Sequence, residues 1–383
     1  MIEPNEAFEI LWATGISAEV IKLPIELTSG KTLAEDIVCD HDLPPFDRVM
    51  MDGFAVRFDA LSSTSLFKIC GVQRAGIPPL SLTSEIECVE VMTGCVLPDG
   101  CDTVVPVEFT ERDGDLVQVT QKNLVRGQNI HKRAQDHTSG DVLVRKGSVI
   151  HAGIAGIAAS CGMSELRVFG IESAAILSTG DELVDIPLKP EAWQIRKSNS
   201  HVLSSILYSL GIPHRIDHST DEIAQLSQEI LSHSDVKLLL ITGAVSMGKF
   251  DLVPQVLQSL GYNVLFHKVR QKPGKPLLAA MRNNQLVIAL PGNPISVLAC
   301  ACRYIIPLLS QAKSKELVIC NDLQFKVHPF TQFIPVKRIF NSAQAIAWNG
   351  SGDFASIATA DGFVEIPAGC EVIPQNLNFY RIP

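Results

Sequence analysis

The chain has 383 residues, of which 46% are hydrophobic and 19% charged, and its formal net charge is −9. Because single hydrophobic cores stop growing at roughly 250–300 residues, this length predicts several domains. The composition excludes a disordered chain, and the acidic balance argues against nucleic acid or an anionic membrane as a partner.

The N-terminal segment and the cysteines indicate the compartment. Residues 1–10 contain three glutamates and no basic residue, which is unlike a secretory signal. The longest apolar stretches, 152–163 and 297–309, are shorter than the roughly 20 residues that a membrane helix needs. Ten cysteines occur without CxxC spacing, which favours reduced thiols. We therefore expect a cytoplasmic protein without a membrane span.

The first 172 residues predict two domains. An amphipathic helix with Ala7, Ile10 and Leu11 on one face opens the chain, and an apolar helix is expected at 151–161. Between them, short β-type runs such as 88–92, 103–107 and 116–120 alternate with Gly, Pro and Asp turns. We expect a discontinuous first domain (1–43 and 137–172) around a β-rich second domain (44–136).

From residue 173 the pattern alternates between strand and helix. The predicted strands are 174–178, 212–216, 238–242 and 285–290, and the predicted helices are 198–210, 221–232, 251–260 and 294–311. This alternation predicts a parallel sheet with helices on both faces and ligands at the carboxyl ends of its strands. The fold class is therefore a multidomain α/β protein, with an α/β domain at 173–315 and a small C-terminal β domain at 316–383.

Two loops that follow predicted strands have the composition of an anion site. They are STGDEL (178–183) and TGAVSMGKFD (242–251). In the second loop, Gly243 and Gly248 let backbone N–H groups approach a ligand, Ser246 adds a hydroxyl, and the next helix presents its positive N-terminus. The alternative is an ordinary strand-to-helix turn with Asp251 as the helix N-cap.

A basic segment lies further along the chain. Residues 252–315 contain eight basic residues and no acidic one, and we expect this charge to lie near the presumed site. In its densest part, KVRQKPGKP (268–276), prolines and Gly274 fix a turn that presents Lys272 and Lys275. LPGNPIS (290–296) directs another helix start to the same sheet edge. A solvated basic loop is the alternative interpretation.

The β-rich domain has two candidate turns. PPFDRVMMDGFAVR (44–57) places Asp52 before a glycine, and MTGCVLPDG (92–100) does the same for Thr93. Both are also ordinary turn residues. No GxSxG elbow is present, so a serine hydrolase is not supported.

Read in order, these motifs resemble the molybdopterin molybdenumtransferase family of molybdenum cofactor biosynthesis. The resemblance also rests on GQNIHKRAQDHTSGDVL (127–143) and on NGSGDFASIATADGF (349–363), which is similar to the family's last domain. It implies a homodimer of four-domain subunits with a molybdopterin-binding α/β domain. It also implies that adenylylated molybdopterin and molybdate give molybdenum cofactor and AMP, assisted by Mg²⁺, and that a molybdopterin adenylyltransferase is a transient partner.

The resemblance also implies roles for residues. Asp52, Thr93 and Asp136 of one subunit would face Glu182, Asp251, Lys272 and Lys275 of the other, and Glu182 and Asp251 would hold the metal. The expected binding residues for the pterin and its phosphate lie in three loops and the last domain: Thr179, Gly180, Asp181, Gly243, Ala244, Val245, Ser246, Gly248, Pro291, Gly292, Asn293, Ser296 and Ser351.

Several residues depart from the family pattern. His131 and Gln135 stand where the family has an arginine and a carboxylate, with Arg133 as a candidate replacement. Ala244 replaces a glycine, and Thr220 stands where an acidic residue is expected, one place before Asp221. These departures leave open a paralogue that binds molybdopterin, or acts as a scaffold, without turnover. The α/β domain alone also resembles adenylyltransferases and pyridine-nucleotide amidohydrolases. The choice between molybdate and tungstate stays open.

Overall fold

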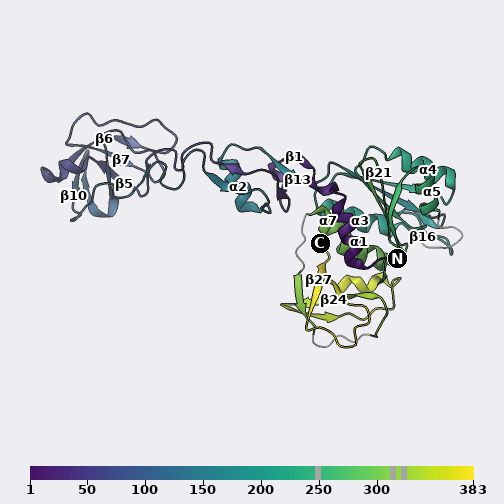
Figure 1. Cartoon of the computed structure of the whole chain (residues 1–383). Coiled ribbons are helices and arrows are strands. Elements are labelled where there is room, and N and C mark those ends of the chain that lie inside the picture. Colours follow the sequence, from purple (N-terminus) through teal and green to yellow (C-terminus); the bar gives the residue numbers. More distant parts are fainter. Residues whose placement is uncertain (246–251, 311–315, 321–325) are drawn as a thin grey trace. The chain divides into compact units, whose positions relative to one another are not determined.

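The computed structural model describes residues 1–245, 252–310, 316–320 and 326–383. These residues form two compact units (Figure 1). The larger unit contains residues 1–35, 146–155 and 164–383, and the smaller unit contains 36–145 and 156–163. Helix α2 (Ala152–Ser160) contributes to both. Within the described ranges, no helix is long and apolar enough to span a membrane.

A six-stranded sheet organises the smaller unit. Its order is β8–β5–β7–β6–β10–β9, and only the β6–β7 pair is parallel. The strands are β5 (Gly53–Val56), β6 (Leu66–Gln73), β7 (Glu87–Val91), β8 (Thr103–Pro106), β9 (Thr110–Asp113) and β10 (Leu116–Val119). Successive residues of β5 enter two different cores, Phe54 and Val56 on one face and Ala55 on the other. The predicted runs at 88–92, 103–107 and 116–120 are confirmed as strands.

The smaller unit also contains two short strand pairs, and the larger unit contains a small three-stranded sheet. In the smaller unit β4 (Arg48–Val49) pairs with β11 (Ile130–His131), and β3 (Ile37–Val38) pairs with β12 (Val142–Val144). In the larger unit a three-stranded sheet contains β1 (Val20–Pro24), β13 (Glu165–Phe169) and β2 (Thr32–Leu33).

The central sheet of the larger unit has the order β17–β14–β18–β22–β21–β19. Its strands are β14 (Ala174–Thr179), β17 (His214–Ser219), β18 (Leu238–Thr242), β19 (Asn263–His267), β21 (Leu278–Arg282) and β22 (Gln285–Leu290). The first four in spatial order are parallel, as predicted. Strands β21 and β19 extend the sheet in antiparallel fashion and were not predicted, because the long basic turn separates them in sequence.

Helices cover both faces of this sheet, as the alternation predicted. Helices α3 (Ser198–Ser209) and α6 (Pro294–Cys300) share one core with Ile176, while α4 (Ile223–Ser232) and α5 (Val253–Ser259) share the other with Leu177. Figure 1 shows α4 and α5 side by side. Helix α1 (Pro4–Ala13) joins the α3–α6 core.

The long helix predicted at 294–311 is interrupted. After α6, residues Ala301–Ile305 form a π-helical turn, and α7 (Ile306–Leu309) follows. Residues beyond 310 of that prediction lie outside the described ranges. Inserted π turns are frequent at functional sites, and this turn lies next to the basic loop.

A six-stranded sheet forms the C-terminal part. It contains β20 (Gln271–Lys272), β23 (Glu316–Ile319), β24 (Thr331–Ile339), β25 (Ser342–Ala345), β26 (Gly362–Ile366) and β27 (Asn376–Arg381), and an extra β24–β26 pairing closes the last five on themselves. Strand β20 belongs to the basic turn and pairs with β24, so the turn is joined to this sheet.

Candidate functional site

A cavity of about 590 Å³ opens at the carboxyl ends of β14 and β18. Thr179, Glu182 and Gly243 line it from two loops, and Gly292 and Asn293 line it from a third. The Thr179 hydroxyl donates a hydrogen bond to the Thr242 carbonyl (3.2 Å), which ties the first two loops together. The cavity therefore lies at the sheet edge where ligands of parallel α/β folds bind.

Two polar atoms on the walls of this cavity lack partners. Ser178 Oγ and Asn199 Oδ1 are buried and form no hydrogen bond with the part of the chain that the structure describes, while Asn199 Nδ2 donates to the Gly292 carbonyl at 2.6 Å. Because buried polar atoms are normally paired, these two suit a ligand that supplies hydrogen-bonding groups. Our sequence analysis did not identify Asn199, which opens α3 outside any motif.

The backbone conformation of the two loops explains why Gly180 and Gly243 are glycines. Gly180 has φ +138° and Gly243 has φ +95°. A Cβ at Gly243 would lie 2.7 Å from the Thr179 carbonyl oxygen, so only glycine fits. Ala244, however, also has a positive φ, +47°, which is strained for an alanine. Val245 is buried, and its carbonyl accepts a hydrogen bond from His267 Nε2.

Three predicted site residues, Ser246, Gly248 and Asp251, lie outside the described residues.

Acidic side chains gather beside the cavity. The Asp221 backbone N–H donates to Asp181 Oδ1 at 3.2 Å. Burial raises the pKa of Asp221, and the charges of Asp181 and Glu182 raise it further. Thr220 instead donates to the Gln225 side chain. Asp221, rather than Thr220, therefore lies with the acidic group beside the cavity.

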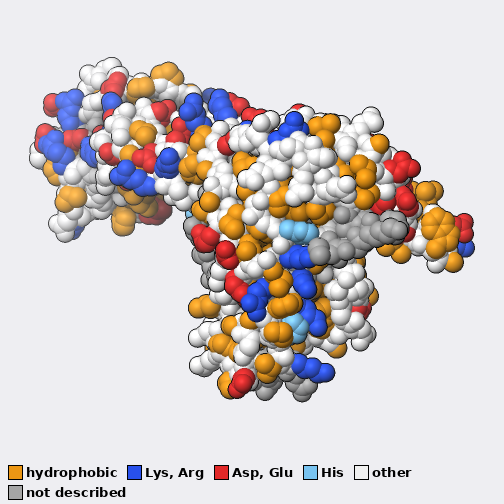
Figure 2. Space-filling model, turned by 45° about the vertical axis from the view of Figure 1, so that its right-hand side comes forward, with side chains coloured by type: hydrophobic (Ala, Val, Ile, Leu, Met, Phe, Trp, Pro, Cys, Tyr) orange, Lys and Arg blue, Asp and Glu red, His pale blue; other side chains and the backbone are white. Residues whose placement is uncertain are grey.

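A second cavity, of about 1,060 Å³, shares Gly292 and Asn293 with the first. Lys272 and Lys275 line it from the basic turn, and Lys326 and His328 line it from the C-terminal part. Figure 2 shows Lys and Arg side chains gathered where the α/β and C-terminal parts of the larger unit meet. This concentration of positive charge suits an anion.

The aromatic ring of Phe330 supports one of these lysines. Lys275 Nζ lies 5.5 Å from the ring centroid, a cation–π distance. The Phe330 N–H donates to His328 Nδ1 at 3.0 Å, so a neutral His328 carries its proton on Nε2. The sequence analysis did not identify Lys326 and His328, because they follow no strand of the central sheet.

The last domain reaches the LPGNPIS loop. Asn293 Nδ2 donates to Ser351 Oγ at 2.9 Å, and the Ile295 N–H donates to the Ser351 carbonyl at 3.2 Å. Ser296 is buried in the first turn of α6 and, with Pro291, lines the second cavity. The structure therefore brings Ser351 to the loop residues with which the resemblance grouped it.

The basic segment does not serve the site as a whole, contrary to our expectation. Arg303 is 1% exposed and packs against Phe8 and Tyr380, where Nη2 donates to Asn5 Oδ1 at 2.7 Å. Arg282 lies over the Tyr262 ring, 5.7 Å from its centroid. Lys313 and Lys315 lie outside the described residues. A run of like charge along a sequence does not predict a common surface, because strands and helices turn these side chains apart.

In the smaller unit the two predicted turns meet. Asp52 Oδ1 accepts hydrogen bonds from the Thr93 N–H (2.6 Å) and from its hydroxyl (2.7 Å). Both bonds lower the pKa of Asp52, so an exposed carboxylate is held ionised in one orientation.

Of the departures from the family pattern in this unit, His131 lies in a network with Arg48 and Asp136. His131 Nε2 lies 2.9 Å from Asp136 Oδ1, and Arg48 Nη2 lies 3.0 Å from His131 Nδ1. Arg48 faces His131 because β4 pairs with β11.

Arg133 instead donates to Asp42 at 2.7 Å, and Gln135 accepts the Lys132 N–H at 3.0 Å. Arg48, rather than Arg133, is therefore the arginine that contacts His131.

The comparisons with known proteins agree with this architecture. The model described as MoeA N-terminal region (domain I and II) matches residues 2–162, and the probable molybdopterin binding domain matches residues 175–311. Together with the fold, these matches define a molybdopterin-binding α/β protein with a MoeA-type N-terminal region.

Full-length relatives make the assignment more specific. Curated proteins named molybdopterin molybdenumtransferase are 34% identical in Synechocystis sp. (96% of each chain) and 31% identical in Staphylococcus aureus (96% of this chain, 92% of the relative). A crystal structure of a molybdopterin biosynthesis MoeA protein from Pyrococcus horikoshii has a TM-score of 0.81 at 28% identity, covering 100% of this chain and 99% of that one. The chain belongs to the molybdopterin molybdenumtransferase family.

Proposed function

We propose that this protein converts adenylylated molybdopterin and molybdate into molybdenum cofactor and AMP. The observation that carries this proposal is the pair of adjoining cavities, which share Gly292 and Asn293 but differ in character. The first has unpaired polar atoms, which suit a pterin, and the Glu182 carboxylate, which suits a cation bound to the phosphate of that pterin. The second has Lys272 and Lys275, which suit an oxyanion such as molybdate or tungstate.

The proposed chemistry matches these side chains. Release of AMP requires cleavage of a phosphoanhydride: an oxygen of molybdate or of water attacks one phosphorus, the P–O bond to the other phosphate breaks, and the oxygens of the departing phosphate gain negative charge. Lys272 and Lys275 would stabilise this charge, while Gly180 and Gly243 permit close approach of a phosphate to the loop backbone.

Magnesium fits the acidic side of the site. Mg²⁺ binds proteins through one or two carboxylates and completes its shell with water and substrate phosphates. Glu182 provides one such carboxylate and Asp251 is the proposed second. Within the described ranges no group of three acidic, His or Cys side chains forms a metal site by itself. When bound, the ion would neutralise phosphate oxygens of the substrate.

The proposal also includes a homodimer. Asp52, Thr93 and Asp136 belong to the smaller unit, whereas Glu182, Lys272 and Lys275 belong to the larger one. We propose that the smaller unit of one subunit completes the site on the larger unit of the other, and that a molybdopterin adenylyltransferase delivers the substrate by transient contact.

The activity test measures AMP. Purified protein is given adenylylated molybdopterin, molybdate and Mg²⁺, and AMP is quantified by chromatography. We expect release above the enzyme-free blank, and a loss of at least about tenfold in Lys275→Gln because a transition-state charge loses its partner. Lys68→Gln, an exposed lysine on β6, is the matched control and should keep full activity. Absence of AMP from the unaltered protein would overturn the proposal.

A second candidate is a molybdopterin-binding protein without turnover. The strained backbone at Ala244 and the Arg48–His131–Asp136 network favour it, because both lie at departures from the family pattern. Titration calorimetry with molybdopterin separates the two. Tight binding without AMP release supports the second candidate, and absence of binding eliminates it. A nucleotide-handling enzyme would leave the family match over residues 2–162 without a role.

A further inference from the structure

The turn that carries Lys272 and Lys275 rests on a buried amide. Gln271 has 0% exposure, and its side-chain Nε2 donates to the carbonyls of Pro273 and Gly274, each at 3.3 Å. The same nitrogen lies 3.4 Å from Cys300 Sγ. The two carbonyls belong to the residues between the lysines, so this amide holds the centre of the turn.

The groups around Gln271 favour one orientation of its amide. The Tyr304 hydroxyl donates to Gln271 Oε1, and burial raises the pKa of Tyr304 well above its usual value, so the proton stays on the hydroxyl. Burial also raises the pKa of Cys300 to about 12, which keeps it a thiol. Because the Pro273 and Gly274 carbonyls can only accept, the amide nitrogen must face the turn, and its oxygen then faces Tyr304.

The turn packs closely against this support at Gly274. Gly274 has φ +92°, and a Cβ there would lie 2.5 Å from Cys300 Sγ and 2.6 Å from Gln271 Nε2. On its other side the turn is fixed by β20, which pairs with β24. Loss of the Gln271 amide would leave the Pro273 carbonyl without its donor and the Gly274 carbonyl with only the weak Cys300 Sγ contact at 3.9 Å, which destabilises the turn unless it changes shape.

We propose that Gln271 is a positioning residue for the anion cavity. Its amide sets the separation and direction of the Lys272 and Lys275 ammonium groups, and the Tyr304 hydroxyl stabilises the amide in this orientation by donating to its oxygen. This inference rests on the proposed role of the two lysines. It predicts that loss of the amide raises the KM for molybdate, whereas loss of another buried amide elsewhere lowers only the melting temperature.

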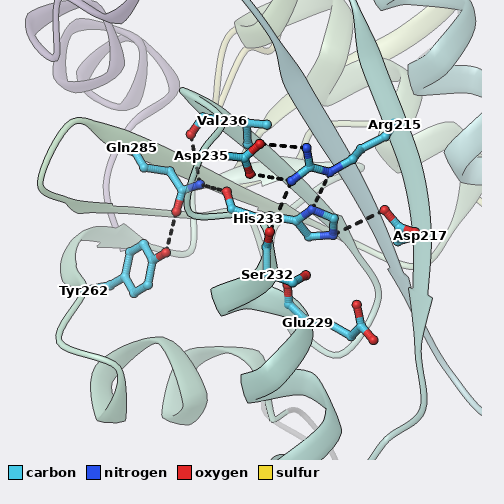
Figure 3. Close-up of polar contacts among 9 residues, drawn as sticks. All are labelled: Arg215, Asp217, Glu229, Ser232, His233, Asp235, Val236, Tyr262 and Gln285. Atoms are coloured by element: carbon cyan, nitrogen blue, oxygen red, sulfur yellow. Dashed lines mark hydrogen bonds and ion pairs between the residues drawn. The ribbon is translucent and has the colours of Figure 1, made fainter.

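The chain provides a matched control with the same chemistry elsewhere. Gln285 opens β22, at the end of that strand remote from both cavities. Its Oε1 accepts a hydrogen bond from the Tyr262 hydroxyl, and its Nε2 donates to the carbonyls of His233 (2.5 Å) and Val236 (3.0 Å) (Figure 3). Gln271 and Gln285 thus have the same kinds of partners but differ in distance from the proposed site.

The experiment compares Gln271→Leu with Gln285→Leu, and Tyr304→Phe with Tyr262→Phe. All four variants should lower the melting temperature, because each leaves buried polar groups unpaired. In the AMP-release assay, Gln271→Leu should raise the KM for molybdate by about tenfold, since small misplacements of charged groups are costly. Tyr304→Phe should raise it less, and the Gln285 and Tyr262 variants should leave it unchanged.

A second readout does not depend on turnover. The acetylation rates of Lys272 and Lys275 by acetic anhydride are measured by mass spectrometry relative to Lys68. We expect the ratio to change at least about twofold in Gln271→Leu and to stay constant in Gln285→Leu, because lysine reactivity follows the environment of the amine. If the unaltered protein releases no AMP but this ratio changes, the proposed function fails and the positioning role stands. Unchanged ratios in Gln271→Leu, or equal changes in Gln285→Leu, would overturn the inference.

Discussion

Two alanines occupy backbone positions that favour glycine. Ala244 has φ +47° beside the first cavity, and Ala134 has φ +60° between Arg133 and Gln135. A left-handed conformation costs a residue with a Cβ roughly 1–2 kcal/mol. Both alanines lie in segments that depart from the family pattern, so the cost falls on loops of the proposed site.

Replacing Ala244 with glycine should therefore stabilise the protein. Relief of the strain is partly offset by the greater freedom of glycine in the unfolded chain, so Ala244→Gly should raise the free energy of unfolding by about 0.5–1 kcal/mol. Urea titration measures the change. Ala224→Gly is the control: it is exposed in α4 and should lose up to about 1 kcal/mol. A similar loss in Ala244→Gly would show that the loop has no strain to relieve.

His233 is a buried histidine that the structure holds neutral. Its side chain is 3% exposed, and its Nδ1 accepts a hydrogen bond from Arg215 Nε at 2.9 Å (Figure 3). Burial lowers the pKa of His233, and the Arg215 charge lowers it further, against opposing effects of Asp217, Glu229 and Asp235. Protonation would place an N–H group against the Arg215 donor.

This arrangement predicts loss of stability in mild acid. Because the folded-state pKa lies below the unfolded value of about 6.5, the unfolded chain takes up a proton first as the pH falls, and the free energy of unfolding decreases below that pH. Urea titrations at pH 7.5 and 5.5 should show a smaller decrease in His233→Gln than in the unaltered protein. The share due to His218, whose pKa burial also lowers, should remain. Equal decreases in both proteins would contradict the assignment to His233.

At the scale of elements, a buried ion pair joins the π-helical turn to the C-terminal sheet. Arg303 Nε lies 3.8 Å from Glu365 Oε2, and their side chains are 2% and 10% exposed. The same Glu365 oxygen accepts hydrogen bonds from Tyr380 (2.5 Å) and Asn378 (3.1 Å) on β27. The guanidinium also packs on the rings of Phe8 and Tyr304. Residues of α1, the π-helical turn, β26 and β27 therefore all contact this ion pair.

Neutralising one partner should destabilise this junction strongly. Glu365→Gln keeps the shape but leaves the Arg303 charge buried without compensation, which costs about 3–5 kcal/mol. The double variant Arg303→Met with Glu365→Gln should recover part of that loss. Glu316→Gln removes the partner of Arg338 in an exposed pair and should cost less than about 1 kcal/mol in the same urea titration. If Glu365→Gln costs no more than Glu316→Gln, the buried pair does not hold the elements together.

Local periodicity explains which elements were predictable. Strand β14 and helix α4 follow from apolar spacing within a few residues, and sequence analysis placed both. Strands β19 and β21 pair with each other across the basic turn, and the π-helical turn depends on packing. Apolar spacing within a few residues therefore indicates neither this strand pairing nor the π-helical turn.

The same distinction applies to the candidate site. Asp52 and Thr93 were each identifiable only as turn residues, and their hydrogen bond joins positions 41 apart in sequence. Asn199 and His328 carry no motif at all and reach the cavities through tertiary packing. The family resemblance grouped the residues that lie in motifs. The unpaired atoms of Ser178 and Asn199, and the hydrogen bonds by which Gln271 supports the basic turn, depend on tertiary packing and could not be predicted from the sequence.

At the scale of the whole molecule, the proposed catalytic residues are divided between two units. Asp52, Thr93 and Asp136 have hydrogen-bonded surroundings within the smaller unit, and Glu182, Lys272 and Lys275 surround the cavities of the larger unit. Each half is ordered by its own contacts, so a substitution in one half leaves the other intact. This independence makes the proposed sharing of a site between subunits testable by complementation.

Mixing two strongly impaired variants should raise the AMP-release rate above that of either variant if the site forms between subunits. Asp52→Asn damages only the smaller unit and Lys275→Gln only the larger one. After subunit exchange, half of the dimers would contain both variants, and each mixed dimer would have one intact and one doubly damaged site. The mixture should therefore reach about one quarter of the unaltered AMP-release rate. A mixture of Asp52→Asn with Thr93→Val, both in the smaller unit, has no intact site and should show no gain over the two single variants. Failure of the first mixture, with exchange verified by mass spectrometry, would assign the site to a single subunit.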